Sequence, residues 1–353
     1  MSSKRWKQRP PGSTWGDWGE DDELGRINLL TEQKVLQGAA EIREGRTFSL
    51  SLPLDLPGGS VFNQRRYPPI VVPTEDLAHT PDVFYNVVAR EKILPSLNDV
   101  WSDDKVTLWP QYSTQWDALA HQGAEFDADA DGVPEALYYN GYRAGVDVIG
   151  PREDARGDGS GSKSHSAHLG MEHMAVHGVQ GRGVLIDLAH HLGDTESQPV
   201  GIDTLTDIMN RDGAVVEPGD VVLLHTGFDR HVLRWNGTPP TLPEVNATAS
   251  YLDAYDPGIL DWIADSQLSA LVADNIAVEG VGLKREHPPE PHTLLPIHHH
   301  CLFRLGVPLG ELWYLDQLAA WLREHGRSRF LLTAPPLRMP GLQGSPLTPI
   351  ATV

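Results

Sequence analysis

Short apolar runs alternate with amphipathic segments through the second half of the chain. The runs that predict buried strands are 183–188, 220–225, 268–272 and 330–332. The segments whose apolar residues recur with helical spacing are 203–210, 257–264 and 316–324. Because strands and helices alternate along the chain, the pattern favours an α/β layer fold.

The first half is less regular. Thr31 is placed to cap a helix that runs to about Glu44, and the alternation of residues 48–52 predicts a strand that Pro53 stops. Residues 53–110 are rich in Pro and Asp and have no clear period. We therefore expect loops and short strands there that line a site.

The composition is that of an ordinary globular protein, with 353 residues, 40% hydrophobic and 22% charged. Residues 1–14 have charges but no apolar core, so we expect a flexible tail rather than a secretory signal. No apolar run is long enough to predict a membrane span. Cys301 is the only cysteine, which excludes an intrachain disulfide and favours a cytoplasmic location.

The charge balance argues against some partners. Lys and Arg number 28 and Asp and Glu 48, a formal net charge of −20 at pH 7. Nucleic acid and anionic membrane surfaces are therefore not expected partners. An acidic surface keeps a protein soluble and also attracts cations, including divalent metals.

A short segment, Gln111–His121, carries the first candidate chemistry. Gln115 and Asp117 are two residues apart, so on an extended strand they face the same side. His121 follows four residues later and returns to the same place if the chain turns after Asp117. A carboxylate beside an imidazole suits metal-assisted hydrolysis, although an Asp and a His at this spacing also form ordinary surface hydrogen bonds.

A second candidate lies near the C-terminus. His298, His299 and His300 are consecutive, and Glu311 opens an apolar segment where a carboxylate would be partly buried. A buried charge needs a partner, and a metal ion would provide one. A run of histidines is also common at protein surfaces, and three neighbours on one loop or helix cannot all face one way.

The segment 111–121 resembles the motif His-x-Gly-Thr-His-x-Asp-x-Pro-x-His of the metal-dependent cyclase-like hydrolases, a family that includes bacterial kynurenine formamidase and isatin hydrolase. Thr114, Asp117 and His121 match the motif, whereas Gln111 and Gln115 replace its first two histidines. Ser113 and Leu119 stand where the motif has Gly and Pro. The 12-residue spacing from His299 to Glu311 resembles the second ligand segment, and the resemblance extends from about Trp15 to Ile350.

The resemblance implies a fold and an assembly. We expect one α/β domain over residues 15–353, with a mixed β-sheet flanked by helices in a swivelling β/β/α arrangement. Homodimers or homotetramers are implied as well.

It also implies a site. Asp117, His299 and Glu311 would hold one divalent metal, Zn or Mn, with Gln115 as a further ligand. His121 would be the acid–base residue. The roles of His298 and His300 stay open.

The implied reaction is hydrolysis of a C–N amide bond in a formamide, lactam or cyclic imide. We expect a small, planar or aromatic substrate flanked by Tyr112 and Trp116, although Trp116 equally suits core packing. Two alternatives remain: a lactonase or dehydratase that acts on C–O bonds, and a metal- or ligand-binding protein without catalysis.

Overall fold

The computed structural model describes residues 5–75, 83–150, 164–281 and 292–353. Within these residues, the centre of the protein is a nine-stranded mixed sheet. In spatial order its strands are β1 (Thr47–Ser49), β20 (Ile350–Thr352), β18 (Arg329–Thr333), β12 (Gln180–Asp187), β14 (Val221–His225), β16 (Ala270–Ala273), β17 (Leu309–Glu311), β7 (Gln115–Asp117) and β19 (Gly344–Pro346).

Four neighbouring strands, β12, β14, β16 and β17, run parallel, and the outer strands pair antiparallel to them or to each other. The helices are α1 (Glu32–Ala39), α2 (Ala89–Lys92), α3 (Met171–His177), α4 (Leu188–Leu192), α5 (Ile202–Asp212), α6 (Phe228–Trp235), α7 (Leu242–Asn246), α8 (Pro257–Asp265), α9 (Pro296–His298) and α10 (Asp316–Glu324), with 3₁₀ turns η1 (Gly25–Leu29) and η2 (Tyr139–Gly141) and a π-helix η3 (His299–Leu305). None of the helices in the described part of the chain is long and apolar enough to cross a membrane.

Each face of the sheet is covered by its own apolar core. On β12, Val184 and Ile186 belong to the first core, whereas Leu185 belongs to the second. This alternation follows from the two-residue period of a strand. Helices α5, α8 and η3 add side chains to the first core, and α3 and α10 add them to the second. The expected α/β fold with a mixed sheet flanked by helices is confirmed.

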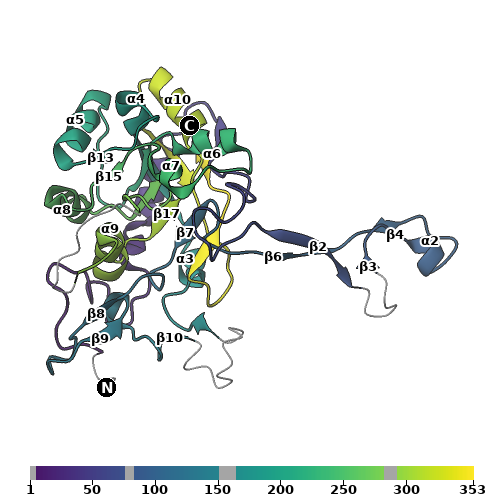
Figure 1. The fold of residues 1–353 in the computed structure, drawn as a ribbon, viewed down its shortest axis with the longest axis horizontal. Coiled ribbons are helices and arrows are strands. Elements are labelled where there is room, and N and C mark those ends of the chain that lie inside the picture. The colour runs from purple at the N-terminus through teal and green to yellow at the C-terminus, as the bar shows by residue number, and fades with distance from the viewer. Residues whose placement is uncertain (1–4, 76–82, 151–163, 282–291) are drawn as a thin grey trace.

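Small sheets and an arm surround this centre. The short strands are β2 (Ile70–Glu75), β3 (Val83–Phe84), β4 (Val87–Val88), β5 (Val100–Trp101), β6 (Asp104–Thr107), β8 (Ala124–Phe126), β9 (Glu135–Leu137), β10 (Val148–Ile149), β11 (His165–Ser166), β13 (Pro199–Val200) and β15 (Tyr251–Leu252). Strands β2 to β6 and helix α2 form an arm that projects far from the body (Figure 1). The segment 53–110 therefore lines the site only near its beginning.

The N-terminal segment differs from the expected loose tail. Residues 1–4 lie outside the described residues, but from Arg5 onward the chain packs on the body. Trp6 is buried against Trp15, and the backbone N–H of Lys7 donates to the carbonyl of Ala128 at 2.7 Å. Aromatic side chains thus fix a segment whose charged composition alone indicated mobility.

Candidate metal site

Two carboxylates meet on one face of the sheet because β7 and β17 are neighbours. The antiparallel register places Leu309 opposite Asp117 and Glu311 opposite Gln115. Gln115 and Asp117 share a face, and the Nε2 of Gln115 donates to Glu311 Oε2 at 2.8 Å and to Asp117 Oδ1 at 3.4 Å. The amide Nε2 thus bridges the two acids as a donor, while Gln115 Oε1, the atom that would bind a metal, has no hydrogen-bond partner among the described residues, so the expected ligand role of Gln115 stays a prediction.

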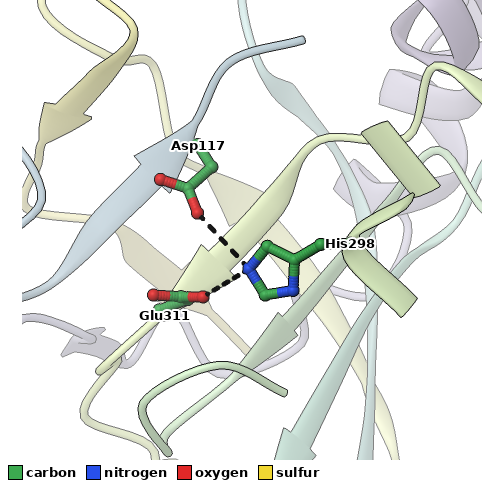
Figure 2. A group of neighbouring side chains, drawn as sticks. All are labelled: Asp117, His298 and Glu311. Carbon is green, nitrogen blue, oxygen red and sulfur yellow. Dashed lines mark hydrogen bonds and ion pairs between the residues drawn. The ribbon is translucent and has the colours of Figure 1, made fainter. Parts of the chain in front are cut away.

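His298 completes the cluster from the end of α9. Its Nε2 lies 3.1 Å from Glu311 Oε1 and 3.9 Å from Asp117 Oδ2, and the three side chains point toward one another (Figure 2). The ligand atoms of Asp117, His298 and Glu311 all lie within 4.8 Å of one another. An imidazole and two carboxylates form a mixed N/O set that suits Zn or Mn.

Glu279 fixes the orientation of His298. Its Oε1 accepts hydrogen bonds from the backbone N–H of His298 at 2.9 Å and from the ring Nδ1 at 2.8 Å. Its Oε2 accepts the N–H of Ile297 at 3.1 Å. Because Nδ1 is held by this carboxylate, Nε2 is the nitrogen directed at Asp117 and Glu311. Metal-binding histidines in proteins are oriented by the same kind of carboxylate partner.

The buried acids favour a positive charge between them. Burial raises the pKa of Asp117 to about 6, and the charge of Glu311 acts in the same direction. Burial alone would lower the pKa of His298, but its hydrogen bonds to Glu279 and Glu311 raise it to about 10. Among the described residues, Asp117 Oδ2 has no hydrogen-bond partner although the residue is fully buried. A divalent cation would satisfy that oxygen and replace the proton on His298.

A cavity of about 440 Å³ opens beside this cluster. Its wall includes Phe62, Arg66, Tyr112, His121, His298 and Glu311. His121 Nε2 lies 3.8 Å from Asp117 Oδ2, and burial lowers the pKa of this imidazole, which favours its neutral form. The volume is adequate for a small substrate, and polar groups converge at one end.

His299, the expected metal ligand, lies outside the cluster. Its ring packs against Phe303 at 5.2 Å between centroids and faces a different cavity, one lined by Gly123 and Thr293. Consecutive residues on a helix point about 100° apart, so only one histidine of the run can face Asp117 and Glu311. That residue is His298. His300 is buried, and burial lowers the pKa of both His299 and His300 to about 4.

Of the two aromatic residues expected to flank a substrate, one lines the cavity. Tyr112 lies in the wall and donates its hydroxyl to the carbonyl of Gly59 at 3.1 Å. Trp116 points to the opposite face of β7, because it lies between Gln115 and Asp117 in the strand. It is fully buried against Trp313 and donates to the carbonyl of Ala334 at 2.9 Å. Its expected contact with a substrate is therefore wrong, and it packs in the core.

Sequence reasoning also missed Glu279 and Arg66. Glu279 follows a buried apolar segment, which is a weak signal for a buried acid. Arg66 lies in the segment 53–110, whose course the pattern did not predict; it donates to the carbonyl of Gln111 at 2.7 Å. No short motif links either residue to Asp117.

Comparison with known proteins assigns the chain to a family. The family model described as Putative cyclase matches residues 48–280. A crystal structure of a novel cyclase is 29% identical, with a TM-score of 0.71, and the match covers 98% of this chain and 100% of that one.

Isatin hydrolases share the fold at lower identity. Isatin hydrolase A from Labrenzia aggregata, bound to benzyl benzoate, is 14% identical with a TM-score of 0.54, covering 91% of this chain and 98% of that one. An isatin hydrolase bound to the product analogue thioisatinate is 13% identical with a TM-score of 0.52, covering 92% and 99%. No curated protein matches the chain. Because the family model covers well over half of its length, this protein belongs to the cyclase family.

Proposed function

We propose that this protein is a metal-dependent hydrolase that cleaves a C–N amide bond in a formamide, lactam or cyclic imide. The observation that carries the proposal is the meeting of Asp117, His298 and Glu311 beside a cavity of about 440 Å³, whose wall includes His298 and Glu311. The isatin hydrolases supply the substrate class, because they share the fold and their name denotes hydrolysis of a cyclic amide.

The residues fit a divalent cation. Asp117 Oδ2 is buried without a hydrogen-bond partner among the described residues, and it faces Nε2 of His298 at 3.9 Å. This separation is too long for a hydrogen bond but suits two ligands that share one ion. When bound, Zn or Mn supplies a water of lowered pKa and polarises the substrate carbonyl. We propose one such ion in this cavity, held by Asp117, His298 and Glu311.

The remaining residues position the substrate and move protons. His121 is neutral when its pKa is lowered, so Nε2 can accept a proton and return it to the leaving nitrogen. Gln115 holds the two carboxylates in place through Nε2. Phe62 and Tyr112 give the cavity apolar walls for a planar substrate, and Arg66 places a positive charge in the same wall.

Turnover tests the reaction class. Purified protein with Zn²⁺ or Mn²⁺ is assayed on a panel of formamides, lactams, cyclic imides and lactones, with Asp117→Ala as the inactive control. Hydrolysis of an amide that is lost in the variant supports the proposal. Exclusive hydrolysis of lactones would support the C–O alternative, and metal binding without turnover would support a non-catalytic binding protein.

We also propose that the protein forms a homodimer or homotetramer through the arm. In the small sheet β3-β2-β6 of the arm, β2 and β6 carry exposed apolar side chains, with Val71 63% and Val106 52% exposed. These two residues are cross-strand partners, so a second copy could cover them together. The double variant Val71→Lys, Val106→Lys should sediment as a monomer. An unchanged sedimentation coefficient would contradict this role.

A further inference from the structure

A second polar cluster lies where the parallel strands β12, β14 and β16 end. Asp187 and His225 are the last residues of β12 and β14, and Asp274 follows β16. Each comes two residues after a side chain of the second core, namely Leu185, Leu223 and Val272. Glu311 comes two residues after Leu309 of the first core. The strand period therefore places this cluster on the opposite face of the sheet from the cavity.

His225 is held with one nitrogen directed at carboxylates. The residue is 1% exposed, and its Nδ1 lies 2.7 Å from Asp187 Oδ1. Its Nε2 has no hydrogen-bond partner within the described residues. That nitrogen lies 3.8 Å from Asp229 Oδ1 and 3.8 Å from Asp316 Oδ1, which is beyond hydrogen-bond distance.

The two buried carboxylates of the cluster are fixed by backbone groups. Asp274 accepts hydrogen bonds from the N–H groups of Thr226 and Gly227 and from the Thr226 hydroxyl. Asp229 accepts the N–H groups of residues 315 and 316 at the start of α10. Both acids are fully buried, and their ligand atoms lie within 4.8 Å of each other and of the His225 nitrogen. One oxygen of each acid accepts a single N–H, Asp274 Oδ2 from Gly227 and Asp229 Oδ1 from Arg230, so that oxygen keeps a lone pair for another partner.

The charged groups around the cluster leave an excess of negative charge. Arg323 pairs with Asp187, and Arg230 pairs with Asp316 at 3.2 Å. Asp229 and Asp274 have only His225 as a nearby cationic group among the described residues. Two buried carboxylates against one imidazole form an arrangement that a cation would stabilise.

The arrangement repeats that of the candidate metal site. There Glu279 holds His298 Nδ1 at 2.8 Å, and Nε2 faces Asp117 at 3.9 Å. Here Asp187 holds His225 Nδ1 at 2.7 Å, and Nε2 faces Asp229 at 3.8 Å. Ligands about 2.0–2.2 Å from one ion are separated by roughly 3–4 Å, which matches both spacings.

We propose that His225, Asp229 and Asp274 bind a second divalent cation, Mn²⁺ or Zn²⁺, with the partly exposed Asp316 as a fourth ligand. The ion would join the ends of β14 and β16 to the starts of α6 and α10. It lies on the face of the sheet away from the cavity, so it would stabilise the fold and would not contact the substrate. The site is independent of the function proposed above.

Equilibrium dialysis against Mn²⁺, followed by elemental analysis, tests this site. Wild-type protein should retain about two equivalents per chain, and His225→Gln about one. Asp117→Ala should also retain about one, and the double variant none. His191→Gln is the matched control, because His191 pairs with Asp212 at 2.8 Å near the surface; it should retain both equivalents.

Several outcomes separate the proposals. A His225→Gln protein that binds as much Mn²⁺ as wild type overturns the second site and leaves the first intact. If the single variant Asp117→Ala retains no Mn²⁺ at all, the second site is also overturned. If His225→Gln does not fold, Asp229→Asn is used as the test variant in its place. If neither variant folds, the number of Mn²⁺ equivalents that Asp117→Ala retains decides whether the second site exists. A third group of acids, Asp127, Asp129 and Asp131, lies at the surface and could also bind Mn²⁺. Asp129→Asn, added to Asp117→Ala, weakens that group; the retained equivalent should persist, and its loss would overturn the site.

Discussion

Replacing Glu279 by Gln tests how the protein prepares His298 for a metal. The carboxylate accepts three N–H groups, two on Oε1 and one on Oε2. A Gln side chain has one accepting oxygen, so its NH₂ group must face at least one of these donors. The best fit keeps both bonds to His298 and leaves the N–H of Ile297 unpaired. Such a buried, unsatisfied donor costs about 1–3 kcal/mol of folding free energy.

The effect on metal affinity follows from the lost charge behind the imidazole. Mutating a partner that orients a metal-binding histidine lowers affinity by roughly 10–100-fold, or about 1.4–2.7 kcal/mol. We therefore expect Glu279→Gln to bind Mn²⁺ at the Asp117 site 10–100-fold more weakly. Competition with a chelator of known affinity measures the Mn²⁺ affinity. Both proteins also carry His225→Gln, so that only the cavity site is titrated.

Glu23→Gln is the matched control. Glu23 also accepts a backbone N–H, from Leu169 at 2.6 Å, and pairs with His168 and His173 at 2.9 Å each, but it does not line the cavity. The Glu23→Gln substitution should lower the free energy of unfolding while leaving the Mn²⁺ affinity unchanged. Equal affinities of Glu279→Gln and its background protein would refute the positioning role. An equal loss in the Glu23 control would show that the effect is not specific.

Three further predictions concern single side chains. His121→Gln should reduce kcat by about 10²–10⁴-fold on an identified amide substrate while metal content stays constant; loss of the metal would instead make His121 a ligand. Trp116→Phe removes the hydrogen bond to Ala334 and should lower the free energy of unfolding by roughly 1–3 kcal/mol, measured by urea denaturation, without changing KM. A changed KM at unchanged stability would instead show that Trp116 contacts the substrate. The Glu23–His173 pair should stabilise the fold most between pH 4.5 and 6.5. Hydrogen bonds to His173 and His168 outweigh burial and lower the pKa of Glu23 from 4.5 to about 2, so its stabilisation is lost as pH falls across that interval. The hydrogen bond to Glu23 raises the pKa of His173 above 6.5, so that contribution is lost as pH rises through the higher value. Urea midpoints of wild type and Glu23→Gln should differ most inside this window, and a constant difference at every pH would contradict the assignment.

The regular elements of the second half could be predicted because burial imposes a period on the sequence. The expected helix at 257–264 is α8 (Pro257–Asp265), and the expected strand at 220–225 is β14. Thr31 caps α1 by accepting the N–H of Lys34, as its position indicated, although the helix ends at Ala39 instead of Glu44. Local chemistry determines these features, so a local pattern reveals them.

The arm and the choice of histidine depend on information that a local pattern does not contain. The apolar residues of β2 and β6 face solvent in a single chain, so the usual link between apolar period and burial fails there. The number of residues between the histidine run and Glu311 is compatible with either His298 or His299 as the metal ligand. Only the rotation of α9 and the contact with Glu279, 19 residues earlier, select His298.

Asp117, His298 and Glu311 are proposed to hold one divalent cation. Crystals grown with Zn²⁺, with diffraction data collected on both sides of the zinc absorption edge, test it most directly. We predict an anomalous peak about 2.0–2.2 Å from a carboxylate oxygen of Asp117, from Nε2 of His298 and from a carboxylate oxygen of Glu311. Well-ordered density for the three side chains, with no peak between them at saturating Zn²⁺, would contradict the account.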